Sequence, residues 1–323
     1  MRRWTLAAVL VAAGCGGGES PEEAFRAALP PEGLRMAVPG GEAAAIAVPG
    51  MLSAGPGVFS SALVGQTAEL YALTRRTSDG VNGMVDGILA SIWGIARQPP
   101  SAVGPDAAVW GPFTPVLSPA TFRLVVERRP DRLVFHLDAR PKGAGDDAFR
   151  PVAAGGPDPA APPERAIGEF GVDLTLLHGL DPVGHPLAGA LGVRHDLGPG
   201  GGSIAVHVQE VAGPGEPPLT ADYRYALGPG GAGVFGFAAH ADLAGGPEQL
   251  EDGLIVSRWT PAGAGRADAR VTGGDAGAGA DASECWDDLF ARVWFAFGPS
   301  QGPPVEEGDP SRCAFAEPLV PGP

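Results

Sequence analysis

Three histidines are the residues best suited to acid–base or metal chemistry in this chain. Each lies in a segment where apolar and polar residues alternate, and each falls on the polar side of that alternation. The histidines are His136, His207 and His240, and their polar neighbours are Asp138, Arg140, Gln209 and Asp242. Histidine titrates near neutral pH and is a common metal ligand. If the three segments were neighbouring strands, these side chains would form a metal site or an acid–base site.

The alternative for these histidines is the solvated face of a sheet, and the sequence favours it. Polar-side positions in the same segments are charged or small throughout, as expected for a sheet with one wet face. The chain also has no G-x-S-x-G nucleophile motif, no phosphate-binding P-loop and no H-E-x-x-H zinc motif. We therefore assign no catalytic residue, no metal ligand and no cofactor. A hydrolase that uses the His/Asp face is the alternative function.

The N-terminus carries the signature of export. Arg2 and Arg3 precede an apolar stretch from Trp4 to Ala13, and small residues lead to Cys15. This is the layout of a secretory signal. The run Val11-Ala-Ala-Gly-Cys15 resembles the lipobox of bacterial lipoproteins, which implies lipidation of Cys15 and a location in the cell envelope, at the outer membrane facing the periplasm or the surface. The alternative is an ordinary cleaved signal with an unrelated cysteine.

Two further cysteines, Cys285 and Cys313, complete the set of three in the chain. An even pair in an exported protein predicts a disulfide. Closing a loop of this length stabilises the fold by about 3 to 4 kcal/mol in the chain-entropy account. The pair lacks the C-x-x-C spacing of redox sites, so we expect it to fix the C-terminal tail to the fold.

The element that must organise the rest is a long amphipathic helix over residues 67–97. Steps of three and four residues place one apolar stripe along it: Leu70, Leu73, Thr77, Val81, Met84, Ile88, Ile92 and Ile95. Ser78-Asp-Gly could cap a second helix and break this one. Glycines 80, 83, 87 and 94 share one flank, which would allow close approach of another backbone; the coding bias of a Gly-rich chain is the interpretation we favour.

From Ala107 onward the period changes to two, and Gly/Pro turns separate the alternating segments. Short turns join antiparallel neighbours, so we expect a β-rich α+β fold with an antiparallel meander of about ten strands, strongly curved or barrel-like, around the helix. A barrel of ten strands leaves an interior that must be filled. The helix would fill it, with Met84, Ile88 and Ile92 as the candidate lining of any residual cavity.

The chain divides into four predicted parts. Residues 1–14 form the signal peptide, 15–20 the lipidated cysteine and its tether, and 21–65 a small helix with an irregular lead-in. Residues 66–323 form the helix and curved sheet with the C-terminal disulfide loop.

Charge and composition limit the partners. The net charge is −15, and without a basic stripe the chain has no means of releasing counterions from nucleic acid. The layout as a whole looks like uncharacterised lipoproteins of high-GC Gram-negative bacteria and, in architecture only, like periplasmic lipoprotein carriers. That resemblance implies no known activity. We expect a non-enzymatic lipoprotein that is held on a membrane by its acyl anchor and either has a structural role beside an envelope protein or binds an apolar ligand.

Overall fold

The computed structural model describes residues 20–40, 63–243, 250–299 and 303–319. The predicted signal sequence and Cys15 lie outside the described residues. Within them, no helix is both long and apolar enough to span a membrane.

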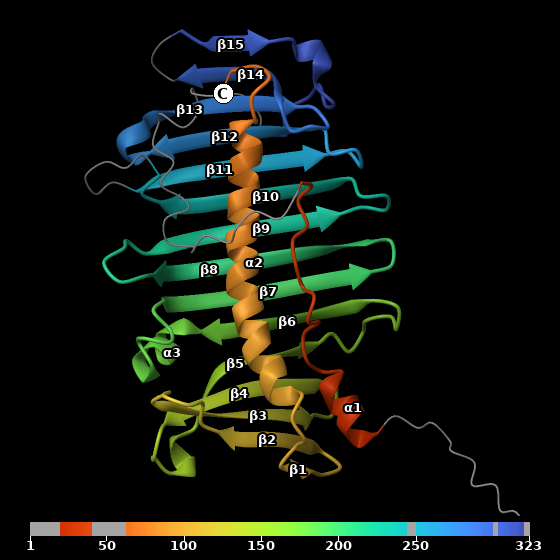
Figure 1. The fold of residues 1–323 in the computed structure, drawn as a ribbon, viewed down its shortest axis with the longest axis vertical. Coiled ribbons are helices and arrows are strands. Elements are labelled where there is room, and N and C mark those ends of the chain that lie inside the picture. The colour runs from red at the N-terminus through yellow and green to blue at the C-terminus, as the bar shows by residue number, and fades with distance from the viewer. Residues whose placement is uncertain (1–19, 41–62, 244–249, 300–302, 320–323) are drawn as a thin grey trace, which may run out of the picture.

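A single antiparallel sheet forms most of the molecule (Figure 1). Its 15 strands follow one another in chain order, so that each pairs with its sequence neighbours. They are β1 (Ala102–Val103), β2 (Ala107–Phe113), β3 (Ala120–Arg128), β4 (Leu133–Pro141), β5 (Arg150–Pro157), β6 (Ala166–Asp173), β7 (Ala188–Gly198), β8 (Gly201–Ala212), β9 (Leu219–Leu227), β10 (Gly233–Ala241), β11 (Glu251–Trp259), β12 (Gly265–Gly273), β13 (Gly277–Trp286), β14 (Arg292–Pro299) and β15 (Val305–Gly308).

The predicted meander is confirmed, but the sheet is open and has more than ten strands. Strands β1 and β15 lie at opposite ends of the order and do not pair. Both are short, with two and four residues, which limits the free edges available for pairing with other chains. The helix therefore covers one face of an open sheet.

Two of the additional strands come from segments rich in glycine and alanine. Strands β5 and β13 fall in stretches that read as loops because few β-branched residues mark them. Gly155 of β5 shows why glycine suits this place: a Cβ atom there would lie 2.2 Å from the carbonyl oxygen of Glu169 on β6. Glycine thus permits the close approach of these two strands.

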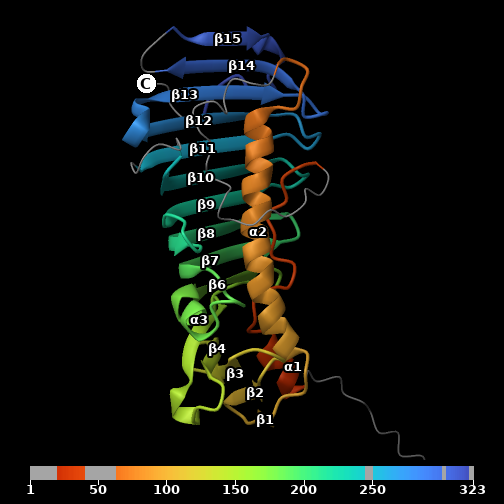
Figure 2. The same cartoon turned by 60° about the vertical axis from the view of Figure 1, so that its left-hand side comes forward.

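Helix α2 (Glu69–Ala96) runs across the strands on one face of the sheet (Figure 2). It matches the predicted helix and continues through Ser78, whose hydroxyl donates to the carbonyl oxygen of Arg75 at 2.9 Å and caps no second helix. The backbone of α2 comes closest to the sheet near its two ends, on β11–β13 and on β2–β3. The middle of the helix is therefore packed through side chains.

A buried ion pair fixes the first turn of α2 to the sheet. Glu284 on β13 is 0% exposed and accepts hydrogen bonds from the backbone N–H groups of Glu69 (3.0 Å) and Leu70 (2.5 Å). Arg292 on β14, 1% exposed, donates its Nε to Glu284 at 2.5 Å. Ala68 at the N-cap has no side chain that could accept these N–H groups, so a carboxylate distant in sequence caps the helix.

The opposite end of α2 is held by α1 (Pro21–Arg26), the predicted small helix. Ser20 and Glu23 form a capping box at its start. Arg26 in its last turn donates to the carbonyl oxygens of Ala96 at 2.8 Å and Gln98 at 3.2 Å. The carbonyls that α2 leaves unpaired at its C-terminus therefore receive a charged donor.

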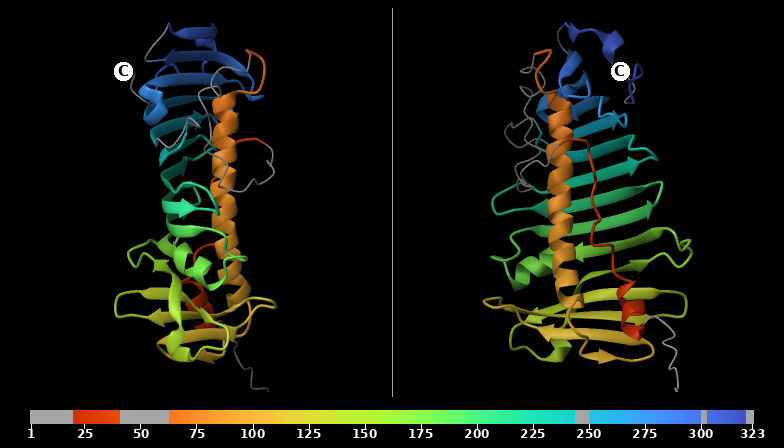
Figure 3. Two further views of the ribbon diagram at one scale, coloured as in Figure 1. Left: turned by 90° about the vertical axis from the view of Figure 1, so that its left-hand side faces the viewer. Right: turned by 45° about the vertical axis from the view of Figure 1, so that its right-hand side comes forward.

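After α1, an extended stretch runs beside α2 on the same face (Figure 3). Asn82 of α2 pairs with the backbone of Met36 in both directions, at 2.8 and 2.9 Å. Tyr71 and Arg75 both donate to the carbonyl oxygen of Pro39, at 2.7 and 2.9 Å. Leu34 and Met36 are buried. The described part of the lead-in therefore packs as one unit with the helix and sheet, and it fills one side of the space between them.

The predicted disulfide between Cys285 and Cys313 is present, with a Cα–Cα distance of 5.4 Å. The tail around it also binds the outer sheet face. Arg266 on β12 donates to the carbonyl oxygen of Ala316 at 2.5 Å, and Asp268 accepts from the N–H of Leu319 at 2.9 Å. Short helical segments complete the fold: α3 (Leu174–Leu180), η3 (Asp146–Ala148), η4 (Gly274–Ala276) and η5 (Pro310–Arg312).

Candidate functional site: an apolar groove beside α2

A groove of about 850 Å³ opens on the side of α2 that the lead-in leaves free. Helix α2 forms one wall, strands β3–β6 form the floor, and α3 with the loop that follows it forms the other wall. The floor consists of large apolar side chains, including Phe122, Leu137, Val152 and Val172. Its size and apolar lining are those of small-molecule sites in proteins.

Glycines on α2 give the groove its depth. Gly80, Gly83 and Gly87 line it, and a Cβ atom built on Gly83 or Gly87 meets nothing within 4 Å. Each glycine inside a helix costs up to about 1 kcal/mol relative to alanine. Three of the four glycines that share a flank in the sequence thus belong to the helix wall of the groove, and no other backbone comes within 4 Å of a Cβ atom at Gly83 or Gly87.

Two of the three predicted cavity residues lie on this groove. Met84 and Ile88 line it and are half-buried. Ile92 is 0% exposed and packs in the core instead. Ile92 belongs with Val85 and Leu89 to the buried stripe of α2 that faces the sheet, whereas Ser91 and Ile95 on either side of it line the groove.

The far wall was not predicted. Helix α3 follows β6 directly, and Asp173 caps it by accepting from the N–H of Leu176 at 2.7 Å. Leu174 and Leu177 of α3 are buried and line the groove. The sequence signal that could have revealed this helix is Asp173 followed by a leucine-rich run with Gly179 near its end.

Polar groups gather where the groove opens, beyond α3. Asp181 accepts from the hydroxyl of Ser118 at 3.3 Å and from the N–H of Gly184 at 2.9 Å. His185 lies beside them, its ring 6.5 Å from that of Phe122. Ser118, Asp181 and His185 all line the groove with their side chains, and Gly184 lines it as well. The groove is thus apolar inside and polar at one mouth, an arrangement that suits an amphiphilic molecule with a long apolar part.

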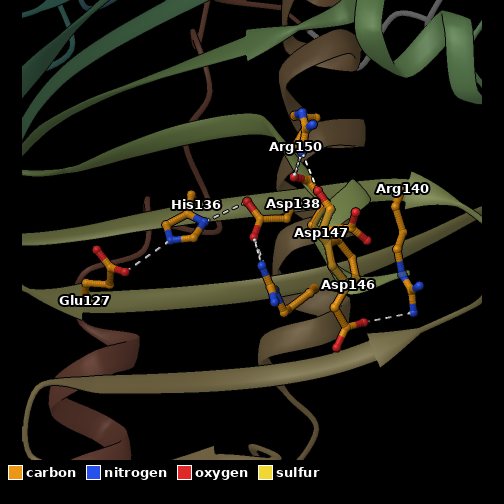
Figure 4. Close-up of polar contacts among 9 residues, drawn as sticks. Glu127, His136, Asp138, Arg140, Asp146, Asp147 and Arg150 are labelled. Carbon is orange, nitrogen blue, oxygen red and sulfur yellow. Dashed lines mark hydrogen bonds and ion pairs between the residues drawn. The ribbon is translucent and has the colours of Figure 1, made fainter. Parts of the chain in front are cut away.

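The predicted His/Asp face lies on the opposite side of the sheet (Figure 4). His136 pairs through Nδ1 with Asp138 at 2.8 Å, and its Nε2 lies 3.7 Å from Glu127. Arg123 pairs with Asp138 at 2.6 Å and stacks on the ring of Phe149, its guanidinium carbon 4.2 Å from the centroid. The result is a charged network on β3 and β4 whose members are already paired.

The other two histidines have separate partners. His207 pairs with Asp222 and His240 with Asp252, each at 3.0 Å, and each pair occupies directly opposite positions on adjacent strands. The three histidines lie on β4, β8 and β10, which are not neighbours, so the condition for a common site is not met. Among the described residues, no group of three or more His, Cys, Asp or Glu side chains is placed to hold a metal ion.

A larger hollow, of about 1300 Å³, covers part of this same outer face from β4 to β11. Some of its charged lining residues form pairs across strands, as Arg194 does with Glu169 at 3.0 Å. No helix residue lines the hollow, whereas the groove is bounded by the sheet and two helices. The groove is therefore the better candidate for holding a ligand.

His195 on β7 is a buried histidine. It is 7% exposed, and its Nδ1 has no hydrogen-bond partner among the described atoms. Burial lowers the pKa of His195 below its ordinary value of 6.5, although the nearby Asp196 opposes the shift. The imidazole is therefore neutral in the folded protein near neutral pH.

This shift predicts a loss of stability in mild acid. The unfolded chain binds a proton at His195 more readily than the folded chain. The free energy of unfolding is therefore unaffected by this group above pH 6.5 and decreases as the pH falls below that value. Urea unfolding at pH 7.5 and 5.5 should show a smaller decrease in the free energy of unfolding for His195→Gln than for the wild type. An equal decrease in both proteins would refute this role.

Comparisons with known proteins supply no guide to function. No protein-family model matches the sequence, no curated protein matches it, and no solved structure matches the fold.

Proposed function

We propose that this protein is a lipid-anchored protein of the bacterial cell envelope that binds an elongated apolar ligand in the groove between α2 and strands β3–β6. The observation that carries the proposal is the groove itself, about 850 Å³ of mostly apolar space that borders the hydrophobic core. Proteins rarely leave such space empty without a use for it.

The asymmetry around α2 supports this proposal. On one side of the helix, the lead-in fills the space with Leu34 and Met36 and is held there by Asn82. On the other side, Gly83 and Gly87 leave open the space that larger side chains would occupy. A helix with a purely structural role would gain stability from larger residues at these positions.

The chemistry of the lining defines the ligand class. Met84, Ile88 and Phe122 offer apolar contact along the groove, and methionine adapts well to flexible apolar ligands. Ser118, Asp181 and His185 at the mouth offer hydrogen bonds to a polar head group. An acyl chain with a small polar head fits this distribution.

The envelope location is part of the proposal and is supported by the N-terminal sequence. Arg2, Arg3 and the apolar stretch before Cys15 form an export signal. The disulfide between Cys285 and Cys313 is consistent with an oxidising compartment. Acyl chains on Cys15 would hold the protein on the membrane, which is a source of amphiphilic molecules.

A direct binding assay tests this function. The purified protein, stripped of bound lipid, is titrated with the uncharged fluorescent probe N-phenyl-1-naphthylamine. We expect saturable binding at one site per chain, and competition by a long-chain fatty acid should displace the probe. A titration without saturation would contradict the proposed function.

The alternative function, a hydrolase that uses the His/Asp face, has its best support in the pair formed by His136 and Asp138 at 2.8 Å. Such a pair orients an imidazole as a general base does. An ester-substrate panel with the wild type and His136→Ala tests it: activity that depends on His136 would establish the alternative, and a panel with no activity would leave it without support.

A further inference from the structure

Three exposed apolar side chains stand at the mouth of the groove. Leu117, Val116 and Val183 are 95%, 92% and 91% exposed, the highest values for large apolar residues in the described chain. The first two lie in the β2–β3 loop, and Val183 lies in the loop between α3 and β7. We call these three residues the apolar tips.

The two loops that carry the apolar tips are joined and flank the groove. The hydroxyl of Ser118 donates to Asp181 at 3.3 Å, which ties one loop to the other. Pro115 and Gly184, one on each loop, line the groove. The apolar tips are therefore direct sequence neighbours of residues that line the groove, and exposed apolar patches mark interaction sites.

The backbone holds the β2–β3 tip in a costly conformation. Leu117 has φ 67°, in the left-handed region that non-glycine residues rarely adopt. The N–H of Ser118 closes the turn on the carbonyl oxygen of Pro115 at 3.1 Å, and the hydroxyl of Ser118 accepts from the N–H of Ala120 at 3.1 Å. The turn thus presents Leu117 outward at the expense of backbone strain, which proteins tend to retain at functional places.

The N-terminal end of the described chain, at Ser20 and α1, indicates what covers the apolar tips. Helix α1 packs on β2 and β3, the two strands that the tip loop connects, so that α1 and the tip loop lie at the same end of the long axis of the molecule (Figure 1). Its contacts, Arg26 over Trp110 and Phe25 under Arg128, lie toward the strand ends remote from the loop. Ser20 at the start of α1 is five residues from Cys15, a distance of at most about 18 Å for an extended chain. With acyl chains on Cys15, this end of the molecule is held close to the bilayer surface.

We propose that the apolar tips insert into the surface of a lipid bilayer, so that an amphiphilic ligand passes directly between the bilayer and the groove. This inference rests on the proposed function, because both the anchor and the ligand belong to it. Insertion of Leu117, Val116 and Val183 removes their side chains from water and contributes binding energy in proportion to the apolar area buried. The net charge of −15 favours an uncharged or zwitterionic bilayer over an anionic one.

Site-specific fluorescence tests the contact. A single fluorophore is attached to the new cysteine of V116C or, as the matched control, of L289C. Leu289 is 81% exposed and lies in the β13–β14 loop, at the opposite end of the sheet. Neither position is packed, and the native pair Cys285–Cys313 is oxidised. Each full-chain variant is reconstituted into phosphatidylcholine vesicles that carry nitroxide groups on their acyl chains.

The proposal predicts at least twofold quenching of the fluorophore at position 116 and none at position 289. Equal quenching at both positions, or none at 116, overturns it; the latter result would point to a protein partner on this surface. Titration of the same samples with N-phenyl-1-naphthylamine separates the two proposals, because a protein that binds no probe contradicts the proposed function whatever the quenching shows.

A second variant tests the role in ligand transfer. Leu117→Ser should slow transfer of a fluorescent fatty acid from vesicles to the protein at least fivefold, while the equilibrium affinity for the same probe added from solution stays within twofold of the wild type. Leu289→Ser should change neither quantity. An unchanged transfer rate in Leu117→Ser overturns the inference and leaves the binding function intact.

Discussion

Replacing Gly87 by leucine should weaken binding of N-phenyl-1-naphthylamine at least tenfold, which corresponds to about 1.4 kcal/mol. Gly87 lies on the groove wall of α2, and a Cβ atom there points into open space. The leucine side chain would occupy the space that the ligand needs. Because leucine is a far better helix former than glycine, the variant should also be as stable as the wild type or more stable.

The matched control is the same substitution two turns further along the helix. Gly94 is exposed, meets nothing within 4 Å and does not line the groove. Gly94→Leu should gain similar helix stability and bind the probe with wild-type affinity. Thermal unfolding of both variants verifies that they fold. Equal affinities for Gly87→Leu and Gly94→Leu would show that the ligand, if any, binds elsewhere.

Replacing Glu284 by glutamine should lower the free energy of unfolding by about 3 to 5 kcal/mol, the range for removing one partner of a buried ion pair. The substitution leaves the guanidinium of Arg292 buried without its nearest carboxylate and weakens the acceptor for two N–H groups of α2. Desolvation raises the pKa of Glu284 even though Arg292 and both N–H groups favour its charged form. The carboxylate therefore depends on these partners.

Urea unfolding of Glu284→Gln measures this effect, and Glu169→Gln serves as its control. Glu169 pairs with Arg194 at 3.0 Å, but both side chains are largely exposed, at 60% and 80%. Exposed pairs contribute about 0 to 1 kcal/mol. A loss below 1 kcal/mol in Glu284→Gln would mean that α2 is held on the sheet mainly by apolar packing.

The sequence predicts the elements with strong periodicity well. Helix α2 follows from its apolar steps, α1 from Ser20, Pro21 and Glu23, and most strands from their alternation. The disulfide follows from the even number of cysteines that remain after Cys15 and from the predicted export signal. Strands β5 and β13 escape prediction because glycine and alanine carry no periodic signal, and their strand structure depends on the neighbours with which they pair.

The open form of the sheet could not be read from the sequence. A strand count of about ten is compatible with a barrel, but closure requires pairing between the first and last strands. Strands β1 and β15 have only two and four residues, and they lie at opposite ends of the strand order. The role of Asn82 was equally hidden. It reads as a polar residue within an apolar helix, whereas its function is to bind the backbone of Met36.

The candidate groove was predicted in part. Met84 and Ile88 follow from the helix stripe, but the glycine wall and α3 depend on which flank of α2 the lead-in covers. That choice is made by contacts between residues far apart in sequence, such as Tyr71 with Pro39. The His/Asp face illustrates the reverse: its residues are easy to find, and the topology separates them.

Native mass spectrometry of the protein, purified gently from membranes, tests the central claim most directly. We predict a discrete added mass, corresponding to one amphiphilic molecule per chain, in the wild type and in Gly94→Leu, and its loss in Gly87→Leu. A wild-type protein without added mass that takes up no fatty acid, or an added mass retained in Gly87→Leu, would contradict the assignment of the groove as a ligand site.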